Sequence, residues 1–229
     1  MMLRTLILPV ALLVSVPVFA QGPVEVPDFR GVAVSSGIHA EVKPGAKSVR
    51  LEGSAEDVAR VKLVVTDGVL RTEVEKEKGS WFFSKGLKNV RLYVTNPRVE
   101  SVAASGGSEI DAEATRVEEF SVAASGGSQI HVTGVDVKTL EAAASGGSQL
   151  ELKGRAGELE LAGSGGSVIE ARDVQAESLK VQASGGTRIE ASAERSITGA
   201  LSGGSIVKAG KKPANVQVSK SGGSEIHYE

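Results

Sequence analysis

The triplet Ser-Gly-Gly occurs seven times in the second half of this 229-residue chain. Its copies begin at Ser105, Ser125, Ser145, Ser164, Ser184, Ser202 and Ser221, with 18 to 20 residues between successive copies. A sequence period near twenty is typical of stacked repeat proteins, in which each unit buries its face against its neighbours. The repeat therefore constrains the fold more tightly than any other feature of the sequence.

Polar and apolar residues alternate after each triplet, which predicts a half-buried strand. The apolar position is filled in turn by Ile110, Ile130, Leu150, Ile169, Ile189, Val207 and Ile226. A second apolar series precedes the triplets and predicts another strand in each period: Phe120, Leu140, Leu159, Leu179, Ile197 and Val216. Equivalent apolar residues recur once per period. In a series of independent hairpins they would instead be mirrored about each turn. We therefore expect an all-β fold, a parallel β-helix or β-solenoid with about 20 residues per coil.

The glycines and serines of the repeat suit the corner of such a coil. Glycine tolerates backbone angles that a Cβ forbids, so Gly-Gly allows a sharp bend while neighbouring coils lie close above and below. Columns of serine are expected to form hydrogen bonds in a narrow interior where leucine would not fit. The alternative is a series of flexible Gly/Ser linkers, but linkers do not place Ile or Leu in register beside every triplet.

Residues 28–98 form a less regular section ahead of the repeats in 99–229. The stretch "FRGVAVSSGIHAEV" is similar to a diverged first copy of the repeat. In this alignment His39 occupies the position of Asp111 and His131. Asp67-Gly68 lies between two alternating runs and predicts a hairpin, and "SAEDVAR" predicts a short helical turn from Ser54. The segment from Trp81 to Phe83 is expected to pack over an end of the core; the alternative is an exposed aromatic loop that binds a partner or a membrane surface.

The first twenty residues have the layout of a secretory signal, with an early Arg4, an apolar run and small residues before Gln21. We expect cleavage after Ala20, so that residues 1–20 are lost and 21–229 form a single domain that does not span a membrane. The expected location is the periplasm, the cell surface or the medium.

The formal net charge of −2 argues against a nucleic-acid partner, and the sequence contains no cysteine for disulfides.

The order of three segments resembles a known family. These are "FRGVAVSSGIHAEVKPG", "LEGSAEDVARVKLVVTDGVLRTEVE" and "VRLYVTNPRVESVAASGGSEI". They are similar to the bacterial domain described as a putative auto-transporter adhesin head, or GIN domain, and the resemblance covers essentially the whole chain after the signal. It implies a β-helical fold, an extracytoplasmic location and a role in adhesion.

The residues beside the buried Ile and Leu positions point outward in a solenoid and are the candidate binding surface. They are Glu109, Gln129, Gln149, Asp111, His131, Glu151, Glu170 and Glu190. Their identical spacing from coil to coil suits a repetitive ligand such as a polymer. We therefore expect a non-catalytic protein that binds an envelope or extracellular polymer, such as a glycan, or a protein, without a cofactor.

Three alternatives remain open from the residues alone. Stacked Asp111, His131 and Glu151 offer ligands for a divalent metal, although a solvated charged face without a metal is the expected outcome. Neighbouring carboxylates from Glu151, Glu170 and Glu190 would have the separation of about 5 Å used by retaining glycosidases, so a polysaccharide-active enzyme is the second alternative. A purely structural envelope module is the third.

Overall fold

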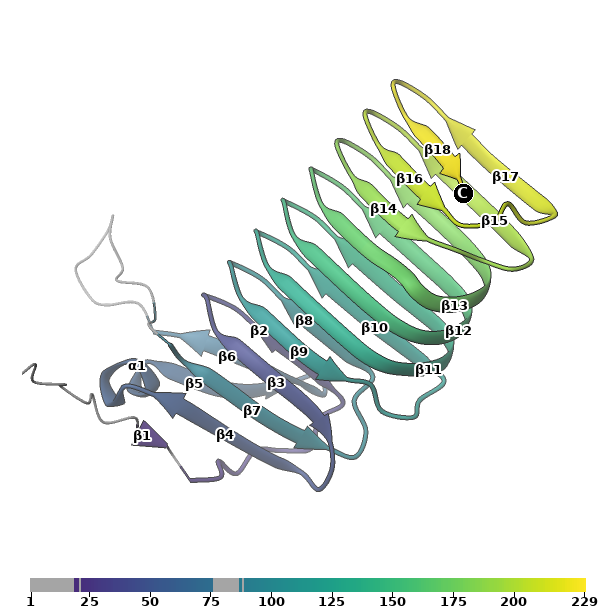
Figure 1. Ribbon diagram of the computed structural model, residues 1–229. Coiled ribbons are helices and arrows are strands. Elements are labelled where there is room, and N and C mark those ends of the chain that lie inside the picture. Colours follow the sequence, from purple (N-terminus) through teal and green to yellow (C-terminus); the bar gives the residue numbers. More distant parts are fainter. Residues whose placement is uncertain (1–18, 21, 76–86, 88) are drawn as a thin grey trace, which may run out of the picture.

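The computed structural model describes residues 19–20, 22–75, 87 and 89–229. Figure 1 shows a row of stacked coils. The repeat section contains β8 (Ser101–Ala104), β9 (Glu109–Glu113), β10 (Glu119–Ala124), β11 (Gln129–Ala144), β12 (Gln149–Gly163), β13 (Val168–Ala183), β14 (Arg188–Ala191), β15 (Ser196–Leu201), β16 (Ile206–Ala209), β17 (Asn215–Lys220) and β18 (Glu225–Tyr228). The predicted parallel β-solenoid, with turns about 20 residues apart, is confirmed.

Each strand pairs in parallel with its counterpart one period along the chain. One side of the solenoid carries the order β9, β11, β12, β13, β14, β16, β18, and the other carries β8, β10, β11, β12, β13, β15, β17. The long strands β11, β12 and β13 belong to both sides because they continue around one edge of the coil. Parallel pairing at one period places equivalent residues in straight columns along the axis.

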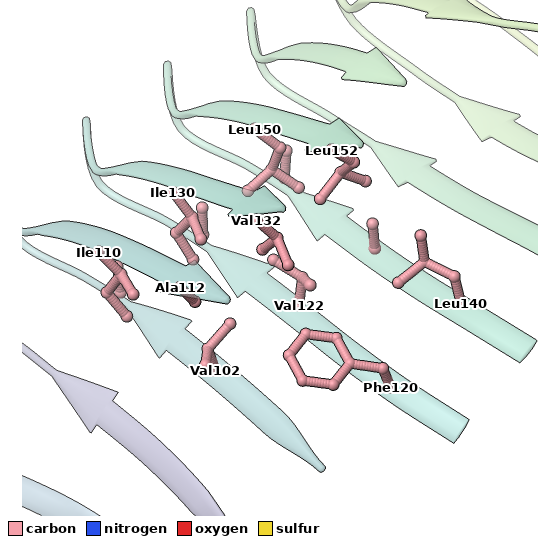
Figure 2. Close-up of a cluster of buried hydrophobic side chains, with 14 of the residues drawn as sticks. Val102, Ile110, Ala112, Phe120, Val122, Ile130, Val132, Leu140, Leu150 and Leu152 are labelled. Carbon is pink, nitrogen blue, oxygen red and sulfur yellow. The ribbon is translucent and has the colours of Figure 1, made fainter. Parts of the chain in front are cut away.

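The core is built from the two apolar series that the sequence predicts. Ile110, Ile130 and Leu150 point inward from one side toward Phe120 and Leu140 on the other (Figure 2). Each of these five side chains is at most 1% exposed. Because each column packs against the columns beside it, the coils share one continuous apolar interior.

The first glycine of every Ser-Gly-Gly corner, from Gly106 to Gly222, adopts the left-handed backbone that the glycines predict. In the third corner, Gly146 and Gly147 have φ of 61° and 77°. The serine after the glycine pair lies inside the corner: Ser148 is 0% exposed, and its hydroxyl contacts the carbonyl oxygens of Ser145 at 2.7 Å and of Ala124 at 3.0 Å. The serine hydroxyl thus joins its own corner to the preceding coil through backbone carbonyls.

The irregular section provides the first coil and a further layer beneath it. This section contains β1 (Phe19–Ala20), β2 (Gly31–Val34), β3 (His39–Pro44), β4 (Ser48–Gly53), α1 (Ala55–Ala59), β5 (Val61–Thr66), β6 (Val69–Val74) and β7 (Arg91–Asn96). Strands β2 and β3 pair in parallel with β8 and β9 on one edge, and with β6 and β7 on the other. Strand β4 pairs antiparallel with both β1 and β7.

Two local predictions for this section are confirmed. Strands β5 and β6 form an antiparallel hairpin whose turn residues Asp67 and Gly68 have φ of 54° and 72°. The Ser54 side chain accepts a hydrogen bond from the Asp57 amide and begins α1. The predicted packing of Trp81 to Phe83 lies outside the described residues. Within the described ranges, no helix has the length and apolar character needed to cross a membrane.

The predicted alignment of His39 is wrong by two residues. His39 is paired with Glu109, and Ala40 lies beside Ile110. Ser36, with φ of 66°, takes the place of the first corner glycine, so the residue count from corner to strand matches the other coils. A shift of two residues keeps a side chain on the same face of its strand, so His39 still points outward.

Candidate binding face

All eight predicted site residues lie on one outer face of the solenoid, formed by β9 and the equivalent strands of later coils. The first column contains Glu109, Gln129 and Gln149, preceded by His39. The second column contains Glu41, Asp111, His131, Glu151, Glu170, Glu190, Lys208 and His227. We refer to these two columns together as the polar face. Its side chains repeat at about 4.8 Å, the spacing of neighbouring strands.

The middle of the polar face contains an ion-paired group centred on Glu151. Its carboxylate lies 2.8 Å from His131 Nδ1 and 2.6 Å from Lys153 Nζ. The hydrogen bonds from Lys153 and then from His131 lower the pKa of Glu151 below its ordinary value. The Glu151 carboxylate is therefore ionised at neutral pH.

A second group lies farther along the same column, around Glu190. Lys208 Nζ lies 3.1 Å from one Glu190 oxygen, and an Arg172 nitrogen lies 3.3 Å from the other. The hydrogen bond from Lys208 is the largest cause of a lowered pKa for Glu190. Arg172 also donates to both carboxylate oxygens of Glu229 at 2.9 Å. Arg172, Glu190, Lys208 and Glu229 therefore form a network of ion pairs at this end of the solenoid.

The first column changes its chemistry along the axis. After Gln149 it continues with Val168, Arg188 and Ile206. Polar side chains therefore fill both columns without interruption from the first coil to β12. The most polar part of the face is next to the irregular section.

The structure also brings together a group that the sequence did not predict. His39 Nδ1 lies 3.2 Å from Glu109 Oε2, and its Nε2 lies 2.9 Å from Asp111 Oδ2. The wrong alignment of His39 concealed this group, because it placed the imidazole two residues farther along β3. The similarity of Ser36-Gly37 to a Gly-Gly corner was the signal that would have corrected it.

The other outer face carries a hollow that also escaped sequence reasoning. A groove of about 610 Å³ runs from β2 to β15. It is lined by a column of outward-facing alanines, which are Ala103, Ala123, Ala143 and Ala162. Beside them lie the serines of the Ser-Gly-Gly triplets, among them Ser105, Ser125, Ser145 and Ser164. The signal was the outward position two residues before each triplet, which is alanine in four successive copies.

These features define the class of the protein: a parallel β-solenoid with an open, repetitive outer surface. The chain belongs to the family described as "Putative auto-transporter adhesin, head GIN domain", whose model matches residues 28–213. The resemblance expected from the order of the sequence segments is thereby confirmed.

Several solved structures have the same fold. A putative adhesin from Bacteroides fragilis superposes with a TM-score of 0.84 at 19% identity, over 94% of this chain and 98% of that one. A putative lipid binding protein from Parabacteroides distasonis gives a TM-score of 0.74 at 12% identity, over 93% and 96%. A putative adhesin from Parabacteroides merdae gives 0.69 at 14% identity, over 93% and 96%. No curated protein matches the sequence closely enough to count as a relative.

Proposed function

We propose that this protein is a non-catalytic, exported adhesin-like module whose polar face binds a repetitive polymer of the cell envelope or its surroundings, such as a glycan, or a protein. The observation that carries the proposal is the in-register arrangement of polar side chains on an open face. A ligand with a short repeat meets polar side chains at the same spacing on successive coils. Membership of a family described as an adhesin head supports the same conclusion.

The electrostatic surroundings of Glu151 and Glu190 favour binding over catalysis at these two positions. A glycosidase needs one carboxyl group with a raised pKa as its general acid. Glu151 and Glu190 both have lowered pKa values, caused mainly by Lys153 and Lys208. These two carboxylates are therefore suited to electrostatic contacts and not to proton donation.

The proposal is tested by screening the purified protein on an array of envelope and extracellular glycans, with envelope proteins as a second panel. A binding column distributes its contacts over several coils, so single substitutions are expected to weaken binding modestly. The combined variant Gln129→Ala, His131→Ala, Gln149→Ala is expected to weaken it much further. The matched control changes three outward residues of the other face: Glu141→Ala, Glu160→Ala, Lys180→Ala.

Each alternative function predicts a different result in this experiment. Turnover of a polysaccharide that Glu170→Gln abolishes, with an unchanged circular dichroism spectrum, would establish the enzyme. Absence of binding to every glycan and protein tested would favour the third alternative, a purely structural envelope module. Loss of binding in the control variant instead of the polar-face variant would move the site to the other face.

A further inference from the structure

His39, Glu109 and Asp111 meet where β3 runs beside β9, at the end of the polar face nearest the irregular section. Within the described part of the chain, they are the group of three whose possible ligand atoms all lie within 4.8 Å of one another. Both imidazole nitrogens face a carboxylate oxygen, at 3.2 Å and 2.9 Å. Two carboxylate groups are thus directed at one imidazole ring.

We propose that these three side chains bind one divalent transition-metal ion, of which Zn²⁺ is the best probe. The combination of one imidazole with two carboxylates suits zinc, whereas magnesium and calcium prefer oxygen ligands alone. The proposal does not depend on the polymer-binding function. It replaces the set Asp111, His131 and Glu151, which the sequence offers as the metal alternative.

The backbone holds the three ligands in place before an ion arrives. Glu109 and Asp111 are two residues apart on β9 and so point to the same side, about 6.6 Å apart along the strand. His39 is the register partner of Glu109 on β3. Both strands have a neighbour on each edge. Ala40, which follows His39, and Ile110, which lies between Glu109 and Asp111, are 0% exposed. The main chain therefore has little freedom to move.

The side chains have the freedom that the main chain lacks. Those of His39, Glu109 and Asp111 are 31%, 45% and 48% exposed. Tetrahedral zinc with bonds of about 2.1 Å holds its ligand atoms about 3.4 Å apart. Each carboxylate faces a different imidazole nitrogen, so binding of one ion requires these exposed side chains to rotate until both carboxylates lie beside the same nitrogen. The remaining coordination positions would face solvent.

The charged neighbours of the group are already paired or lie to one side. Glu41, the register partner of Asp111, pairs with Lys43, and His131 on the next coil bonds to Glu151. Arg91 is the register partner of His39 on β7, the edge away from Glu109. The carboxylates that are directed at the imidazole are therefore those of β9.

The test is calorimetric titration of the protein with ZnCl₂. We expect saturable binding of one ion per chain, weakened about tenfold or more by His39→Gln and by Asp111→Asn. The matched control is His227→Gln, because His227 is also exposed and bonded to a carboxylate, that of Glu225 at 2.8 Å. This control is expected to bind zinc as the wild type does, and an excess of Mg²⁺ is expected not to compete.

The sequence contains three histidines, so imidazole NMR identifies the ligand directly. Zinc is expected to shift the His39 resonances and to leave those of His131 and His227 in place. Equal affinities for the wild type and His39→Gln, with both folded by circular dichroism, would overturn the proposal. A shift of His131 in place of His39 would also overturn it, because the ion would then lie between Asp111 and Glu151.

Discussion

The corner glycines act through two separate physical constraints. Gly146 has φ of 61°, a backbone region in which a Cβ is strained. An added Cβ would also lie 3.3 Å from the amide nitrogen of Gly126 on the neighbouring coil. The same two constraints recur at Gly126, whose Cβ would lie 3.2 Å from the amide nitrogen of Gly106. Stacking therefore restricts the residue type at each corner independently of turn chemistry.

Replacing Gly146 with Val is expected to destabilise the protein by about 2 kcal/mol or more, because a β-branched side chain meets both constraints. The control is Gln149→Ala on the outer face, which is expected to change the free energy of unfolding by less than about 0.5 kcal/mol. Urea denaturation followed by circular dichroism measures both. Equal midpoints for the two variants would show that the triplet acts only as a linker.

At the scale of the strand, parallel pairing in register converts a sequence repeat into columns of like side chains. Inward columns of Ile and Leu bury apolar surface on every coil. Outward side chains form ion pairs between successive coils, such as Lys138 with Glu118 at 2.8 Å and Lys180 with Glu160 at 2.9 Å. Exposed pairs of this kind contribute little individually, so the apolar columns carry most of the stability.

The ion pairs around Glu190 make a small, testable contribution to stability that is present at neutral pH and lost in acid. The pKa of Glu190 is lowered from its ordinary value of 4.5, chiefly by Lys208. The folded state therefore binds its proton less readily than the unfolded state, and the stabilisation is present above pH 4.5 and is lost as pH falls through the lowered value. Urea midpoints measured between pH 7 and pH 3 should fall less steeply for Glu190→Gln than for the wild type.

The appropriate control for this measurement is Lys208→Gln, which removes the main cause of the shift and leaves the carboxylate. It is expected to flatten the same part of the pH profile. A profile for both variants that is parallel to the wild type would mean that the ion pair does not persist in solution.

At the scale of the whole molecule, the irregular section closes one end of the solenoid. Strands β6 and β7 continue the stack below β2 and β3, and β4 and β5 then turn antiparallel. At the other end, the inward residues of the last coil, among them Val216, Val218 and Ile226, are only partly buried. The two ends of the stack are therefore physically different.

The expected signal peptide is a prediction about the whole chain. Cleavage after Ala20 would remove residues 1–20, including β1, and leave Gln21 as the first residue. Because β1 contributes only two residues to the edge of β4, the shortened chain is expected to keep the fold. Intact-mass measurement of protein from the native envelope decides the site. A membrane-bound species that retains residues 1–20 would contradict the assignment.

The sequence by itself determined the coil. A period near twenty, alternation on both sides of each triplet and glycines at the corner predict parallel strands, inward columns and outward columns. These predictions succeed because residues one period apart, such as Ile110 and Ile130, become neighbours through repetition of one local pattern. The polar face followed from the same pattern, since alternation decides which side of a strand each residue occupies.

Only the tertiary structure decided the contacts that the repeat does not encode. The pairing of β6 and β7 with the first coil joins segments of unrelated sequence, and the partner of His39 depends on how Ser36 substitutes for a corner glycine. The alanine-lined groove exists because outward small residues line up over many coils. The register between strands of dissimilar sequence is set by how their side chains pack against each other. The alternation of polar and apolar residues within one strand does not specify that packing.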